Sequence, residues 1–404
     1  MGIAPRGLMS LRFIIMRKKT SIFMLVCWVF GSALFLVTYF FVTHLMLATH
    51  DLLDLKRLAG QNDGNGTGLS AKSLAADFSD TPEGRSLVIR ARRYADLSQK
   101  THIVDGMVVD RDDTGKFIHQ CDSLLFSSLR YVALEHLGFH DLSRPAWEAI
   151  QKSRTPKAGW LRHPRCPETP LSRDMIMGIL AVLSQSPQNA AQVMQWTRED
   201  LHRFNGYISD GPFYISFFSP GFRAAFDEMA MVGGEPSSGL AWSFWTTEFD
   251  AWTADGDYRS HLVALTIWLE FEIEKMGKWK HRSGSTIDAV AFVIDPWMNV
   301  QLRDLRLAWS AQTLLRTDPD NLFFHWLALK SVGALSPQRR VSLANLLLAM
   351  PAFPEDRLPT NCDRRADYVW QRPSSQTRER RAPCSEVFSG TDFLWMSALL
   401  LENP

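Results

Sequence analysis

Apolar residues recur at three- and four-residue spacing over most of the chain, a pattern typical of α-helices that bury one face. The pattern predicts nine helices, at residues 122–137, 173–184, 189–204, 222–232, 259–275, 297–315, 321–332, 336–349 and 391–401. Many of these segments are apolar on most of their circumference, which indicates burial on more than one side. Only residues 103–110 predict a strand, with 115–118 as its candidate hairpin partner. Because strands and helices do not alternate, we expect a mainly α fold and no doubly wound sheet.

One segment near the N-terminus is apolar without any periodicity. Residues 22–43 hold no charged side chain, and about 20 apolar residues span a bilayer as a helix. A cleaved signal peptide has a shorter apolar core of about 7–15 residues, followed by small residues. Here bulky side chains follow instead, so we expect an uncleaved transmembrane anchor in the lipid bilayer over residues 21–47.

Basic residues on the two sides of the predicted anchor set its direction. Five precede it and only Lys56 and Arg57 follow closely, so the positive-inside rule places residues 1–20 in the cytoplasm as a basic tail. Residues 48–85 predict a juxtamembrane helix and then a flexible linker, rich in Gly, Asn, Ser and Asp. Residues 86–404 then form an extracytoplasmic domain, which is periplasmic if the organism is Gram-negative.

The charge balance excludes some classes of function. The chain of 404 residues has 44 basic and 43 acidic residues, a formal net charge of +1. Such a balance creates no strong field toward nucleic acid, and the sequence has no nucleic-acid-binding motif. It also lacks a Gly-x-Ser-x-Gly turn and a phosphate-binding loop, so a serine nucleophile and nucleotide use are unsupported. We expect no nucleic-acid partner and no cofactor.

Four of the five cysteines lie in the predicted outer domain, where oxidising conditions favour disulfides. They are Cys121, Cys166, Cys362 and Cys384. Four cysteines allow three pairings. Cys362 and Cys384 bracket a polar segment that has little apolar surface to bury, and a bond between them would hold that loop. Cys121 then pairs with Cys166 by elimination.

Zinc is the alternative for two of these cysteines. His119 lies close to Cys121, and His163 lies close to Cys166. Two histidines and two cysteines form a plausible zinc set. The outer compartment favours the disulfide, which uses both thiols, so we predict no metal site.

Four of the predicted helices open with a short polar group that holds an acid or an amide. These openings are His119-Gln120-Cys121-Asp122, Ser172-Arg173-Asp174, Asp318-Pro319-Asp320-Asn321 and Ser389-Gly390-Thr391-Asp392. N-capping favours Ser, Asp and Asn at a helix start, which explains each opening taken alone. Their likeness indicates related structural units. If the helices form hairpins around a ring, these partly positive helix starts gather at one rim.

The openings carry a resemblance to a known architecture. Gln120–Phe126, Ser172–Gly178, Asn321–Phe324 and Ser389–Trp395 resemble the starts of the inner helices of (α/α)-toroid proteins, among them the six-hairpin glycosidases and polysaccharide lyases. The resemblance is one of architecture and covers roughly residues 117–402. It implies an (α/α) toroid of helical hairpins, here on a single N-terminal transmembrane helix, with carbohydrate chemistry in a central cleft.

Carboxylates are the first candidates for that chemistry, because glycoside hydrolysis commonly uses one carboxyl group as acid and a second as base or nucleophile. Asp122 and Asp174 open apolar helices, where the helix N-terminus lowers a carboxylate pKa and suits a base or nucleophile. Glu248 and Asp250 lie in an aromatic segment, and an apolar setting raises a pKa, which suits the acid. The alternative for Asp122 and Asp174 is helix capping alone.

Further residues are candidates for holding a substrate. Arg173 is placed to bind a substrate carboxylate. Tyr207, Tyr214 and Trp245 lie in aromatic segments that are candidate cleft walls, with a buried connection between helices as the structural alternative. Trp160, in a predicted loop, is a candidate platform for a sugar ring.

Together these features favour a membrane-anchored extracytoplasmic protein that binds or cleaves a polysaccharide, as a hydrolase or lyase if it is an enzyme. The alternative is a non-catalytic envelope scaffold that binds glycan or protein. Geometry separates the two, because catalysis needs two carboxylates roughly 5–10 Å apart across an open cleft. A scaffold would instead have its acids at helix caps and its hollow filled by Trp, Phe and Leu.

Overall fold

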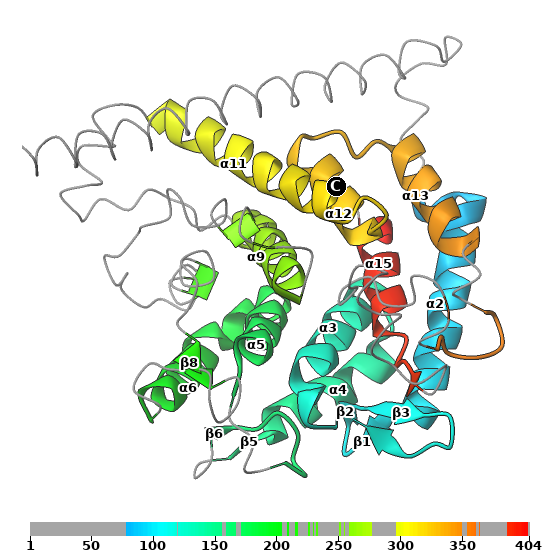
Figure 1. Ribbon diagram of the computed structural model, residues 1–404, viewed down its shortest axis with the longest axis vertical. Helices are drawn as coiled ribbons and strands as arrows, with labels where there is room; N and C mark the ends of the chain where they lie inside the picture. Colours follow the sequence, from blue (N-terminus) through cyan, green and yellow to red (C-terminus); the bar gives the residue numbers. More distant parts are fainter. Residues whose placement is uncertain are drawn as a thin grey trace, which may run out of the picture. The chain divides into compact units, whose positions relative to one another are not determined.

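Ten α-helices dominate the part of the chain that the computed structural model describes (Figure 1). That part comprises residues 78–118, 120–155, 159–166, 171–203, 208–209, 215–216, 225–226, 229, 232, 250–251, 254, 258–276, 296–349, 354–360, 363 and 386–402. The helices are α2 (Pro82–Thr101), α3 (Ser123–His136), α4 (His140–Lys152), α5 (Arg173–Gln185), α6 (Ala190–Arg203), α9 (Tyr258–Lys275), α11 (Pro296–Thr317), α12 (Leu322–Ser331), α13 (Pro337–Ala349) and α15 (Thr391–Leu401). The mainly α fold predicted from periodicity is confirmed.

Eight of the nine predicted helices are present with bounds close to those expected. In the ninth, 222–232, the described residues Ala225, Phe226, Met229 and Val232 have helical backbone. Periodicity misses α2 and α4, which are more polar. Signals for α2 were nevertheless available, because Thr81 accepts a hydrogen bond from the Gly84 N–H as N-cap and Pro82 follows it. Helix α2 thus begins before residue 86, the expected start of the domain.

Burial is highest in the helices whose sequences are apolar all round. Residues 175–183 of α5 and residues 391–400 of α15 are buried without interruption. The prediction of burial on more than one side is therefore confirmed for these helices. They form the centre of the core, and α2 and α4 each bury one face against it.

Helices α3 and α5 run parallel in very close contact. The Leu125 N–H donates to Sδ of Met175 at 3.3 Å, and both are third residues of their helices. A Cβ built on Gly178 would lie 2.9 Å from the Leu125 Cα and 3.1 Å from the Ser128 Cβ. Contacts thus advance along both helices in the same direction. Glycine at 178 permits this approach because it has no side chain.

Helices α12 and α15 also run parallel, since their contacts advance along both helices in the same direction. The ring of Phe323 lies 6.1 Å from that of Trp395, and the Trp326 indole N–H donates to the Leu399 carbonyl at 3.1 Å. Helix α9 joins this group, because the rings of Trp268 and Trp395 meet edge to face at 4.7 Å. The indoles and the phenyl ring fill the space between the three helices.

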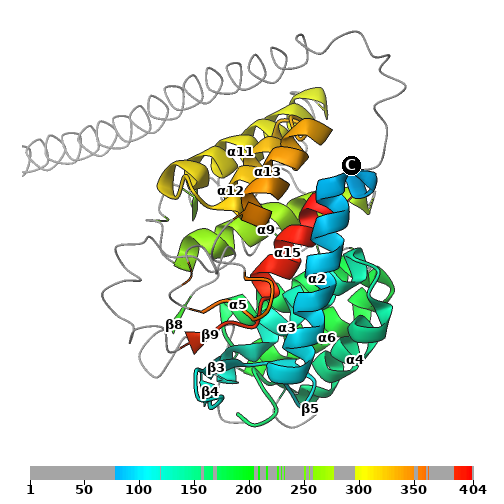
Figure 2. The same cartoon turned by 90° about the vertical axis from the view of Figure 1, so that its right-hand side faces the viewer.

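The contacts among five of the helices close a cycle. Helix α3 contacts α5, α5 contacts α9, α9 contacts α12, α12 contacts α15, and α15 contacts α3. Figures 1 and 2 show α15, in red, beside α2 and near α3. The helices α2, α4, α6, α11 and α13 each contact members of this set.

The strands are short and lie in the connections between helices. They are β1 (Ile103–Val104), β2 (Met107–Val108), β3 (Asp110–Asp112), β4 (Phe117–Ile118), β5 (Arg154–Thr155), β6 (Gly159–Trp160), β7 (Ile208–Ser209), β8 (Ile215–Ser216) and β9 (Glu386–Val387). A single strand over 103–110 is wrong: Asp105 and Gly106, with φ of 52° and 82°, fold β1 and β2 into a hairpin. The expected hairpin with 115–118 is confirmed only at Asp110, because β4 pairs with β3, most of which follows the predicted strand, and β9 adds to the other edge of β3.

The predicted cytoplasmic tail and anchor (1–47) lie outside the described residues. So does the linker up to residue 77. Within the described ranges, no helix combines the length and apolar character needed to cross a bilayer.

Candidate functional site at the helix starts

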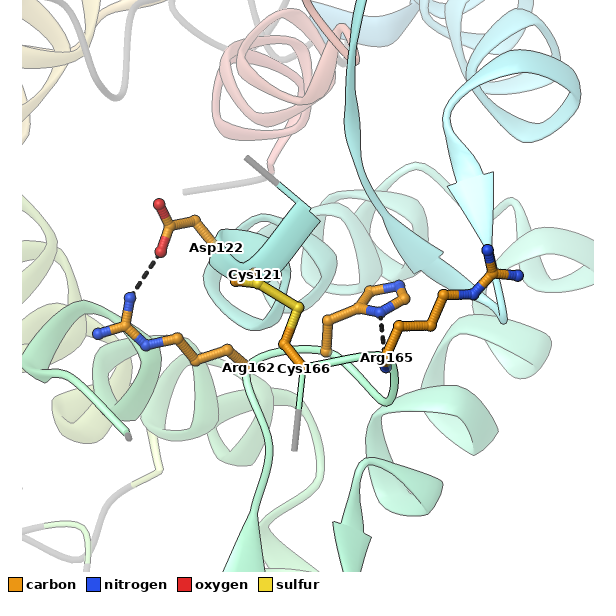
Figure 3. The surroundings of a disulfide bond; sticks show 6 residues. Cys121, Asp122, Arg162, Arg165 and Cys166 are labelled. Atoms are coloured by element: carbon orange, nitrogen blue, oxygen red, sulfur yellow. Dashed lines mark hydrogen bonds and ion pairs between the residues drawn. A yellow bond between two sulfur atoms is a disulfide. The ribbon is translucent and has the colours of Figure 1, made fainter. Parts of the chain in front are cut away.

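The starts of α3, α5 and α15 are gathered on one side by two sets of links. A disulfide between Cys121 and Cys166 joins the residues just before α3 to the loop that leads into α5 (Figure 3). Strand β4 leads into α3 and β9 leads into α15, and both pair with β3. The segments before all three helices are therefore held together, although they lie far apart in the sequence.

The disulfide confirms one of the predicted cysteine pairs. Cys362 and Cys384 lie outside the described residues, as does His119 of the alternative zinc set. The bond uses both thiols of that set. Nδ1 of His163 accepts the Arg165 N–H at 3.1 Å, and its Nε2 donates to the Val104 carbonyl at 3.3 Å. Among the described residues, no group of His, Cys, Asp and Glu is arranged to hold a metal ion.

Asp122 forms an ion pair across the gathered starts. Its Oδ1 accepts a hydrogen bond from Nη1 of Arg162 at 2.7 Å, beside the disulfide (Figure 3). The Asp122 side chain is 49% exposed and that of Arg162 13%. Asp122 occupies the N-cap position of α3, but its side chain makes no cap hydrogen bond. The capping interpretation is therefore wrong for Asp122, whose half-exposed carboxylate faces solvent on one side.

Asp174 lies half-buried in the first turn of α5. It accepts a hydrogen bond from the hydroxyl of Ser172, which as N-cap makes no hydrogen bond to the helix backbone. Arg173 is also half-buried, and its Nε is enclosed and has no hydrogen-bond acceptor among the described residues. The start of α5 thus carries an acid and a guanidinium side by side.

The start of α15 adds a third acid, Asp392, which is 7% exposed. Gly390 before it has a φ of 72°, and the Ser389 and Thr391 hydroxyls lie 2.8 Å apart. Asp392 belongs to one of the predicted helix openings but is not one of the predicted site residues. At the remaining opening, Asn321 accepts the N–H groups of two residues in α12, at 3.0 and 3.3 Å, so capping is confirmed there.

The other predicted site residues are placed as follows. Glu248, Tyr207, Tyr214 and Trp245 lie outside the described residues. Asp250 is half-buried and has helical backbone. Because Glu248 lies outside the described residues, its pairing with another carboxylate stays a prediction.

Trp160 is not an exposed platform for a sugar. It is 3% exposed, its indole N–H donates to Thr197 at 3.1 Å, and its backbone N–H donates to the buried Asp200 at 2.8 Å. The prediction of a sugar platform at Trp160 is wrong, because β6 turns the indole inward against α6.

Neither models of known protein families nor curated proteins match this chain. The three linked helix starts carry the carboxylates of Asp122, Asp174 and Asp392 and the guanidinium of Arg173, and Arg162 from the loop before α5 pairs with Asp122. Carboxylates accept hydrogen bonds and guanidinium groups donate several at once, which is the set that binds hydroxyl-rich or acidic ligands.

Proposed function

We propose that this chain is a membrane-anchored extracytoplasmic protein that binds or cleaves a polysaccharide at the starts of α3, α5 and α15. The observation that supports the proposal is the gathering of three helix starts that each carry a carboxylate. Sugar hydroxyls both donate and accept hydrogen bonds, and alternating acceptors and donors such as Asp122, Arg162 and Asp174 suit them.

The wider architecture is part of the same proposal. The cycle of contacts through α3, α5, α9, α12 and α15 supports an (α/α) toroid in which these five are inner helices. The parallel pairs α3–α5 and α12–α15 support it further, because their starts then share one rim. In this proposal residues 21–47 anchor the protein with its N-terminus in the cytoplasm, and an oxidising outer compartment maintains the disulfide.

A second candidate, a non-catalytic envelope scaffold, is favoured by two specific observations. Asp122 is engaged by Arg162, and Trp268, Phe323 and Trp395 pack together between α9, α12 and α15. A scaffold needs no turnover, so such groups serve only to hold the fold and present a binding surface.

The test uses the full-length protein in detergent micelles with a panel of neutral and acidic polysaccharides. Binding is measured by calorimetry, and cleavage by the release of reducing ends and of unsaturated sugars, which distinguishes a hydrolase from a lyase. If Asp174 is catalytic, Asp174→Asn abolishes turnover and leaves unfolding unchanged, since the amide oxygen still accepts from Ser172. Asp356→Asn, at an exposed position, serves as the control. Binding without cleavage favours the scaffold, and no binding to any glycan contradicts the proposed function.

A further inference from the structure

Arg130 is an arginine buried in the middle of α3. It is 1% exposed, and burial lowers the pKa of its guanidinium to about 10. A group with that pKa is still positively charged at neutral pH. The fold thus encloses a full positive charge.

The guanidinium of Arg130 has few hydrogen-bond partners. It carries five N–H donors, of which Nη2 donates to Oε1 of Gln99 at 3.0 Å, while Nε, although buried, has no acceptor. Within the described part of the chain, no carboxylate forms an ion pair with it. Burial of a charge without a counter-charge is strongly unfavourable.

Two other arginines with little exposed surface have more hydrogen-bond or ion-pair partners, although Nε of Arg154, like that of Arg130, has no acceptor. Arg154, with a side chain 10% exposed, pairs with Glu199 at 3.1 Å and with Asp200 at 3.6 Å. Arg340, 4% exposed, donates to the backbone carbonyls of Leu400 and Glu402 at the end of α15. The comparison shows that Arg154 and Arg340 each have two acceptors, whereas Arg130 has one.

The surroundings of Arg130 are tight. Gln99 belongs to the last turn of α2, and Ser127, one turn before Arg130 on the same face of α3, accepts the Val108 N–H from β2 at 2.8 Å. At 1% exposure, the side chain leaves no path for a large ligand. Any counter-charge must therefore be small.

We propose that Arg130 holds a small inorganic anion, with chloride as the probe, between α2 and α3. The anion accepts the N–H groups that Gln99 does not use and neutralises the buried charge. This inference is independent of the proposed function, because it concerns the interior of α3 and not its start.

The test is thermal unfolding of the full-length protein in detergent micelles at a series of chloride concentrations. Gluconate replaces the missing chloride, so that the ionic strength stays constant. Constant ionic strength removes the general screening effect. An anion that binds only the folded state raises the melting temperature of the wild type by a few degrees between about 5 mM and about 300 mM chloride. Arg130→Met abolishes that rise.

Arg154→Met is the matched control, because Arg154 is buried but already paired: it lowers the melting temperature and leaves the chloride dependence intact. If Arg130→Met does not fold, crystals of the wild type soaked in bromide give an anomalous peak in contact with the guanidinium. The proposal is wrong if wild-type melting is indifferent to chloride and bromide gives no peak there. It is equally wrong if Arg130→Met retains the full chloride dependence.

Discussion

The starts and the ends of the central helices are held together by different means. At the starts, a disulfide and a three-stranded sheet join α3, α5 and α15, and the ion pair there involves a half-exposed Asp122. At the ends, Nζ of Lys275 on α9 contacts Oε1 of Glu272 at 2.7 Å and also the carboxylate of Glu402, which follows α15. Burial raises the pKa of Glu272, and the nearby Lys275 charge opposes that shift.

Two further helices, α12 and α3, also end near Lys275 and Glu272. Lys330, in the last turn of α12, has a pKa lowered by burial and by the positive charge of Lys275. His136, the last residue of α3, acts electrostatically on Glu272. At the ends, therefore, the charged side chains pair with one another and stabilise the fold. At the starts, covalent and backbone links hold the segments together, and the Asp122 carboxylate stays half-exposed.

Loss of the disulfide is expected to be the most costly change at the starts. Cys121→Ser or Cys166→Ser releases a loop with a sequence separation of 45, and lowers the free energy of unfolding by about 3–4 kcal/mol. Urea unfolding of the full-length chain measures the loss, with Cys27→Ser as the control that removes an unrelated thiol. The double variant costs no more than either single one if the two cysteines are bonded, and a sum of two losses contradicts the bond.

Lys275→Met tests the charge cluster at the ends. It leaves the buried Glu272 and its neighbour Glu402 without their shared cation, and we expect a loss of about 2–3 kcal/mol. The loss shrinks as pH falls through the raised pKa of Glu272, because the protonated acid needs no cation. The matched comparison at the starts is Asp122→Asn, which breaks a half-exposed pair and costs less than about 1 kcal/mol. Equal costs for the two variants would remove the contrast between starts and ends.

The buried His102, which contacts the strand before α15, makes the stability of the fold depend on pH. Its Nε2 donates to the Val387 carbonyl in β9, and burial lowers its pKa to about 4. The unfolded chain has a histidine pKa of about 6.5 and so binds the proton first. Stability is therefore unaffected above about pH 6.5 and falls as pH decreases toward 4, by about 2 kcal/mol between pH 7 and pH 5.

His102→Gln removes this acid-dependent loss, measured by urea unfolding as a function of pH. His140→Gln is the control, because the His140 side chain is 67% exposed. A variant that keeps the full loss below pH 6.5 would assign the acid sensitivity to other groups.

Features that depend only on residues close by in the sequence could be predicted from the sequence. Periodicity predicted α5 and α15, whose apolar residues cover the whole circumference, and Asn321 was recognisable as a cap because its partners are the next residues along the chain. Asp122 was misjudged as a possible cap because its partner, Arg162, is 40 residues away in the sequence. Trp160 was misjudged because its orientation depends on Asp200 and Thr197, which reach it only after α6 has packed.

The sequence by itself determined the mainly α class, most helix positions and the polar character of the helix starts, since these follow from the residue types within a few turns of chain. Only the tertiary structure decided that Cys121 meets Cys166, that Gly178 brings α3 and α5 into contact, and that the acids of three helices lie on one side. It also decided that Arg130 is enclosed with a single side-chain partner. The physical reason is that such contacts depend on how separate helices pack, and residue spacing within one helix carries no information about its neighbours.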